Sequence, residues 1–156
     1  MSKLTDTKKA YDVISKVIDQ EIRKRTSSAK DLQRSREVLD VAFYLLGWGQ
    51  FEYLVRKETE SAVLENAKAK GRERHAWLFL KENVKSMTVR QRLEFLFDGK
   101  PDLLAKLKKT YDCWFPRGNQ QYDVRNEAAH DNKGLPVDVL DLSSWLEDLE
   151  ERIDDL

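Results

Sequence analysis

The spacing of apolar residues along the chain follows the period of an α-helix almost throughout. Residues 5–26 form the first such segment, and either Thr5 or Thr7 is suited to cap it. Its apolar positions recur three and four residues apart: Tyr11, Ile14, Val17, Ile18 and Ile22. The polar segment 27–31 (Ser-Ser-Ala-Lys-Asp) follows and predicts a break before the next helix.

A second helical pattern runs from about residue 31 to 70, which is long for a single domain. One straight helix over this range would be about 60 Å long. A compact domain of this size has a radius of gyration of only about 15 Å. The pattern therefore predicts either a bend or break, near Gly47 and Gly49 or near residues 59–61, or an arm that projects from the domain.

Residues 38–55 within this pattern are apolar nearly all round. A helix with apolar residues on every face is buried on more than one side. Two arrangements satisfy this requirement: the central helix of a bundle, or a helix shared between the core and a subunit interface. We favour the central helix, because it requires no second chain.

Shorter helical segments follow, separated by glycine and proline. Residues 75–84 predict one helix, and Thr88 is suited to cap another that ends at Phe97, just before Gly99. Pro101 suits the first turn of the next helix, which the Pro-Arg-Gly segment at 116–118 ends. A further helix is predicted from about residue 120 to 130, with a turn at 132–136 after it.

The last helix has one strongly apolar face. The residues on this face are Leu142, Trp145, Leu146, Leu149, Ile153 and Leu156. Ser144 and Glu147 have the spacing of a capping box, although the helix could begin earlier, near Asp138. The chain has no repeat and no strand pattern, so the sequence predicts a single all-α domain over residues 1–156, a bundle of four to six helices with a long central helix.

Composition restricts the class of protein further. The single cysteine excludes a disulfide framework. The first residues lack the apolar segment of a signal peptide, and the longest uncharged apolar run, residues 41–51, is shorter than the roughly 20 residues that cross a bilayer. We therefore expect a cytoplasmic protein that does not associate with a membrane.

The formal charge is zero, but charges of opposite sign lie in different parts of the chain. Residues 138–156 contain eight acidic residues and one arginine, a net charge of −7. Residues 56–109 contain fourteen basic and eight acidic residues, a net charge of +6. The basic middle could attract a polyanion. Alternatively, the acidic last helix lies across it, and we favour this second interpretation.

The segment DVRNEAAHD, residues 123–131, places the polar side chains of Arg125, Asn126 and His130 on one predicted helix. Asn126 and His130 are four residues apart and share a face. Arg125 and His130 are five apart, so about 140° separates them around the helix. A single straight helix does not readily direct both at one atom. The long arginine side chain near a helix end, or a two-fold dimer in which two copies share a cleft, would bring them together.

These residue types suit cleavage of a phosphodiester. Arginine offers a permanently charged fork to a phosphate, and histidine transfers protons near neutral pH. RNA carries its own nucleophile, the 2′-hydroxyl group. A site that orients the strand, moves protons and neutralises the phosphate therefore needs neither a metal nor another cofactor.

The six residues Arg125-Asn126-Glu127-Ala128-Ala129-His130 resemble the RNxxxH signature of the HEPN superfamily of small helical domains. The resemblance implies a four- or five-helix fold, usually a homodimer whose two motifs meet at the interface. Many members are metal-independent endoribonucleases of toxin–antitoxin, antiviral (abortive-infection) or RNA-processing systems, and some have an antitoxin or nucleotidyltransferase partner. Carried over to this chain, Arg125 would engage the scissile phosphate, His130 would be the acid–base group, and Asn126 would position one of them or the RNA.

Other interpretations of these residues are weaker. The superfamily also contains members that bind without cutting, so a non-catalytic interaction or RNA-binding module is the main alternative. Glu127 and His130 have the spacing of half a di-iron site, but His75 lacks the matching glutamate. Cys113 and His130 could form a nucleophile–base pair, although a lone cysteine in such a helix is more often inert.

Aromatic and basic residues alternate just before the motif. They are Tyr111, Trp114, Phe115, Arg117 and Tyr122. Unpaired bases could stack on such rings, and we select Arg117 and Tyr122 as candidate substrate-binding residues. Core packing explains Trp114 and Phe115 better. His75, which follows Arg72 and Arg74, could line an RNA-binding surface, although a solvated position at a helix edge is the simpler interpretation.

Overall fold

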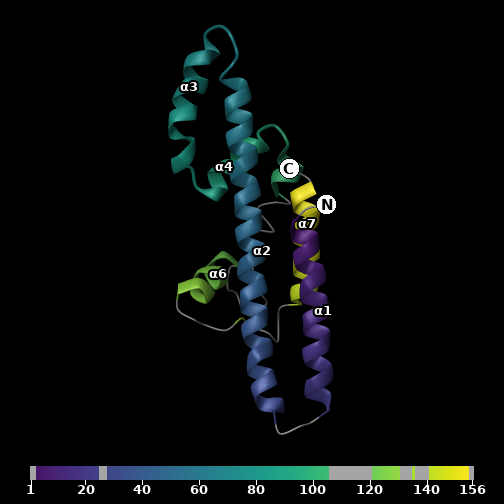
Figure 1. Ribbon diagram of the computed structural model, residues 1–156. Coiled ribbons are helices and arrows are strands. Elements are labelled where there is room, and N and C mark those ends of the chain that lie inside the picture. Colours follow the sequence, from purple (N-terminus) through teal and green to yellow (C-terminus); the bar gives the residue numbers. More distant parts are fainter. Residues whose placement is uncertain (1–2, 25–27, 106–120, 131–134, 136–140, 155–156) are drawn as a thin grey trace.

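The computed structural model describes residues 3–24, 28–105, 121–130, 135 and 141–154 (Figure 1). Its elements are α1 (Lys3–Arg23), α2 (Ala29–Asn66), α3 (Glu73–Asn83), the 3-10 helix η1 (Val84–Ser86), α4 (Val89–Leu96), α6 (Gln121–His130) and α7 (Leu142–Asp154). Residues 101–105 are also helical. No strand occurs in this part of the chain, and the predicted all-α fold is confirmed.

The long central pattern forms one uninterrupted helix. α2 has 38 residues and passes through Gly47, Gly49 and residues 59–61 without a break. The expected bend or break is therefore wrong, because isolated glycines weaken a helix by only about 1 kcal/mol each and tertiary contacts offset this. The arm is correct: Figure 1 shows the end of α2 projecting beyond the bundle with α3 beside it. We call α3, η1 and the facing end of α2 the arm.

The core lies where α7 packs against the hairpin of α1 and α2. α2 contacts α1, α3, η1, α4, α6 and α7, so the prediction of a central helix is confirmed. The ring of Trp145 in α7 lies 4.7 Å from that of Tyr44 and 5.7 Å from that of Trp48, centroid to centroid. The residues buried around these rings include Leu4, Phe51, Val55, Val124, Ala128, Leu142, Leu146 and Leu149.

Polar side chains inside the helical hairpin have partners. The hydroxyl of Tyr11 donates to Asp40 at 2.8 Å, and Arg36 forms an ion pair with the same carboxylate. The Gln50 amide donates to the hydroxyl of Thr7 at 3.0 Å. Thr5 and Thr7 are not caps as predicted, because α1 begins at Lys3 and both lie inside it. Their hydroxyls instead join α1 to its neighbours, since Thr5 bonds to Glu150 of α7.

The ends of the later helices follow local capping rules. Thr88 caps α4 as predicted, and Gln91 completes a capping box with it. Gly99 has φ +79°, a conformation that favours glycine. The predicted box of Ser144 with Glu147 is wrong, because α7 begins two residues earlier. Asp141 caps it by accepting hydrogen bonds from the backbone amide of Ser144 at 3.3 Å and from its hydroxyl at 2.9 Å.

Replacing Asp141 by alanine should lower the free energy of unfolding at pH 7 by about 1 kcal/mol, the usual contribution of an N-cap. Hydrogen bonds from the Ser144 hydroxyl and then its backbone amide lower the pKa of Asp141 below 3.8. The stabilisation is therefore present above about pH 4 and lost as the pH falls through the depressed pKa. Urea unfolding at pH 7 and pH 3 measures this. A difference between the two proteins that is the same at both pH values would contradict the assignment.

In the described part of the chain, the acidic last helix does not lie across the basic helices α3 and α4. α7 contacts α1 and α2, and in the described part it makes no contact with α3 or α4. Its Trp145 lies against residues 44–48 of α2, well before the basic end of that helix. The interpretation that we favoured from the sequence is therefore wrong for the described residues. No described helix is long and apolar enough to cross a membrane.

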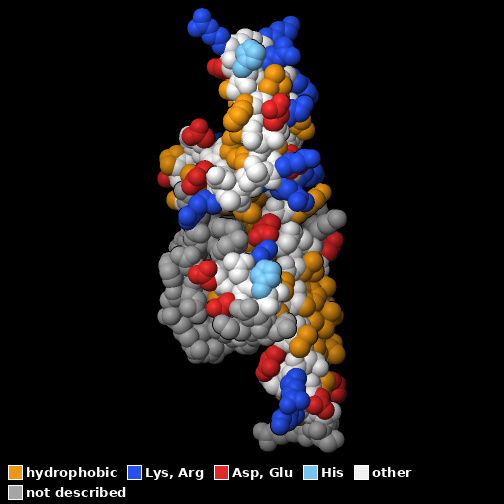
Figure 2. All heavy atoms as spheres, turned by 90° about the vertical axis from the view of Figure 1, so that its left-hand side faces the viewer, with side chains coloured by type: hydrophobic (Ala, Val, Ile, Leu, Met, Phe, Trp, Pro, Cys, Tyr) orange, Lys and Arg blue, Asp and Glu red, His pale blue; other side chains and the backbone are white. Residues whose placement is uncertain are grey.

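Both helices of the α1–α2 hairpin leave apolar side chains exposed. Ile14 and Val17, which the sequence predicts on the apolar face of the first helix, are exposed rather than buried, and so is Val13. Val38 and Leu46 of α2 are also exposed, Val38 by 69%. Figure 2 shows hydrophobic side chains as an orange band along the lower half of the molecule. We call these five residues the hairpin face.

Candidate functional site

The candidate site is carried by α6, a short helix that packs on α2. Val124 and Ala128, four residues apart, form its buried face. Arg125 lies at the edge of this face and is partly buried, whereas His130 is exposed at the last residue of the helix. α6 therefore packs on the core through Val124 and Ala128, and the motif residues lie on the other sides of the helix.

The side chains of Glu52 and Asn126 contact the guanidinium of Arg125. Its Nη2 lies 3.1 Å from Oε2 of Glu52 in α2, and its Nη1 donates to Oδ1 of Asn126 at 2.9 Å. The arginine and glutamate side chains are 25% and 22% exposed, so solvent only partly screens this ion pair. The pair joins α6 to the central helix and fixes the direction of the guanidinium fork.

His130 is not joined to Arg125. Across the described part of the chain, His130 forms no hydrogen bond or ion pair. The structure thus brings together Arg125, Asn126 and Glu52 and leaves the histidine apart. This arrangement agrees with the angle of about 140° that the helical spacing predicts.

Glu52 is the residue that the sequence analysis missed. A signal was available, because residues 38–55 contain only three charged or amide side chains: Asp40, Gln50 and Glu52. Polar groups in such a helix need partners when it is packed on several sides. All three have a partner on another helix, so each marked a tertiary contact.

Two pockets flank this cluster. The first, of about 300 Å³, is lined by Asp123, Val124, Asn126 and Glu127 of α6. The second, of about 310 Å³, lies between α2 and the segment from η1 to α4. Glu52 lines the second pocket and also binds Arg125, so this pocket and the motif adjoin.

No protein-family model, curated protein or solved structure matched this chain. The comparisons therefore identify no family, and the resemblance of the motif is not tested by them.

Few of the remaining candidate residues belong to the described part of the chain. Arg117 and Cys113 are outside the described residues, as are Tyr111, Trp114 and Phe115. Tyr122 belongs to α6, but its side chain is not described. His75 is exposed on α3, far along the chain from α6. No group of three or more His, Cys, Asp or Glu side chains that could hold a metal ion occurs among the described residues.

Proposed function

We propose that this protein is a metal-independent endoribonuclease that acts as a homodimer and cleaves RNA by attack of the 2′-hydroxyl group. The observation that carries this proposal is the geometry of the RNxxxH motif on α6. Arg125 is fixed by Glu52 and Asn126, while His130 is exposed at the helix end. A phosphate reaching Arg125 would meet the histidine of a second chain more readily than that of its own.

The proposed reaction uses each of the three side chains. His130, in its neutral form, removes the proton of the 2′-hydroxyl, and the oxygen attacks the adjacent phosphorus. The bond from phosphorus to the 5′-oxygen breaks, which leaves a 2′,3′-cyclic phosphate and a 5′-hydroxyl after the proton returns to the leaving oxygen. Arg125 neutralises the developing charge on the phosphoryl oxygens, and Asn126 and Glu52 hold its guanidinium in place.

The hairpin face supports a dimer. Exposed apolar patches of this kind mark interaction sites, and a two-fold interface uses the same patch on both subunits. Figure 1 places α6 on the side that Figure 2 turns toward the viewer, and the orange band runs along the edge of that side. The dimer that we propose has its two-fold axis across this face in the direction that places the α6 helices of the two chains next to one another.

The Arg125–Glu52 ion pair also favours a second candidate, a non-catalytic interaction module of the same fold. In that case the pair only docks α6 on α2, and no phosphate reaches the arginine. The two functions differ in whether RNA is cut.

The purified protein should cleave mixed RNA in the presence of EDTA and produce 2′,3′-cyclic phosphate ends. Arg125→Ala and His130→Ala should each lower the rate by about 100-fold or more, because each removes a group that acts on the reacting phosphate. His75→Ala is the matched control, since it removes the only other histidine from an exposed position on α3. The measurement is the rate of appearance of cleaved ends.

Two outcomes would decide against parts of this proposal. Equal cleavage by the wild-type protein and both variants would rule out the assigned site and indicate a contaminating nuclease. No cleavage by any of the proteins, with correct folding, would favour the non-catalytic module.

A further inference from the structure

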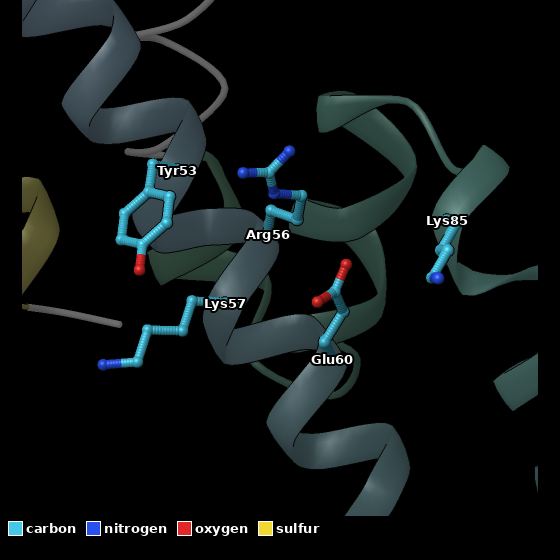
Figure 3. Close-up of a pocket in the computed structure, with 5 residues that line it drawn as sticks. All are labelled: Tyr53, Arg56, Lys57, Glu60 and Lys85. Atoms are coloured by element: carbon cyan, nitrogen blue, oxygen red, sulfur yellow. The ribbon is translucent and has the colours of Figure 1, made fainter.

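A basic pocket lies where the arm joins the bundle. It combines two adjoining hollows that share Tyr53, Arg56 and Lys85. Figure 3 shows that Tyr53, Arg56, Lys57 and Glu60 come from α2, whereas Lys85 comes from the separate segment that contains η1. Its basic residues are Arg56, Lys57, Lys85 and Arg92, and its acidic residues are Glu52 and Glu60. The cations outnumber the carboxylates, so the pocket attracts anions.

Arg92 is the deepest of these cations. The residue is 3% exposed, and it donates through Nε to Met87 O at 3.2 Å and through Nη2 to Val84 O at 2.6 Å. Its Nη1 has no hydrogen-bond partner in the described structure and lies 3.9 Å from Oε1 of Glu60. Burial lowers the pKa of Arg92, the charge of Glu60 partly offsets this, and the charge of Arg56 lowers the pKa further. At this distance the carboxylate of Glu60 balances the buried charge only in part, so a bound anion would be favourable.

The cations at the mouth of the pocket are available. Arg56 and Lys85 are exposed and form no ion pair with any described residue. Glu52 is held by Arg125, and α7 makes no described contact with α3 or α4. The guanidinium of Arg56 lies 5.7 Å from the centroid of the Tyr53 ring, which is itself half exposed. A cation beside an exposed aromatic ring is the combination that binds a phosphate and stacks a base.

We propose that this basic pocket binds a phosphate of single-stranded RNA and that the adjoining base stacks on Tyr53. The inference rests on the proposed function for the choice of RNA, because the pocket adjoins the motif through Glu52, which contacts Arg125. Arg56 lies one turn, about 6 Å, further along α2 than Glu52. A strand whose scissile phosphate is at Arg125 would therefore continue toward Arg56 and Lys85, and the arm extends the binding surface.

Binding of a labelled single-stranded RNA, measured by fluorescence anisotropy, tests this inference. His130→Ala protein in EDTA serves as the background, so that RNA is bound without being cut. Arg56→Gln and Lys85→Gln should each raise Kd about fivefold or more and lower the salt slope, log Kobs against log salt concentration, by about 0.7, as expected for one lost phosphate contact. Lys81→Gln is the matched control, because Lys81 is exposed on α3 and does not line the pocket.

Three further substitutions separate stacking and local charge from a general loss of charge. Tyr53→Leu should raise Kd about tenfold, whereas Tyr53→Phe, which keeps the ring, should not change it. Glu60→Gln should lower Kd, because it removes a carboxylate from the pocket. Thermal unfolding of each variant checks that the fold is retained. Inorganic phosphate and AMP, added as competitors, test whether a free phosphate or a nucleotide binds in place of RNA.

The outcomes for the pocket and for the ribonuclease can be told apart. If Arg56→Gln and Lys85→Gln bind RNA as Lys81→Gln does, or if the background protein binds no RNA, the pocket inference is overturned even where the wild-type protein cleaves. If AMP binds more tightly than the RNA, the occupant is a nucleotide and the inference is again overturned. If the pocket variants weaken binding while the wild-type protein cleaves nothing, the inference holds and the proposed nuclease fails.

Discussion

Replacing Gly47 by alanine should lower the free energy of unfolding by about 2 kcal/mol, although alanine favours a helix more than glycine does. A Cβ atom at Gly47 would lie 2.8 Å from both Cδ2 of Leu146 and Cζ3 of Trp145. Trp145 cannot move away easily, because its ring packs against Tyr44 and Trp48. Thermal unfolding should show a decrease in Tm of about 5 °C.

Gly49 is the matched control for this prediction. It lies on the same helix two residues later, and a Cβ atom there would meet no heavy atom within 4 Å. Gly49→Ala should therefore raise the free energy of unfolding by about 0.5–1 kcal/mol through helix propensity alone. An increase in stability for both variants would mean that α7 does not pack against α2 at Gly47.

The two glycines also show which features of the fold could be predicted from the sequence. Local signals predicted the helices well, since Thr88 caps α4 and the helix that carries the motif begins within one residue of its predicted start. The continuity of α2 was not accessible in the same way. Glycine weakens a helix wherever it occurs, but Gly47 is required by the approach of α7, almost a hundred residues later in the chain. That approach is a tertiary contact and leaves no local pattern.

The candidate site was also predictable from the sequence only in part. The angular separation of Arg125 and His130 is a property of one helix, and the spacing predicted it. The partner of Arg125 is Glu52, 73 residues away, and only the packing of α6 on α2 brings them together. Similarly, the exposed Ile14 and Val17 of α1 have the periodicity of a core face. Periodicity shows that a face is apolar, and the arrangement of the other helices decides whether it is covered.

Mixing Arg125→Ala protein with His130→Ala protein should restore RNA cleavage that neither variant has alone. The prediction follows from the separation of the two side chains within one chain. If a site takes Arg125 from one protomer and His130 from the other, a mixed dimer has one site with both residues intact and one with both replaced. Random exchange makes about half of the dimers mixed, so about a quarter of the wild-type rate is expected. The measurement is the cleavage rate after the two proteins have been refolded together.

The hairpin face provides the control for this rescue. Val38 is exposed, and a charged residue there would be buried in the proposed two-fold interface without a partner. Val38→Glu should therefore yield a folded monomer in sedimentation, and adding it to both variants should prevent rescue. Mixed dimers that form but do not cleave would show that each protomer builds its own site. Because Arg125 and His130 lie on one short helix, that result would require a rearrangement of α6, in which Arg125 leaves Glu52 and reaches toward the helix end.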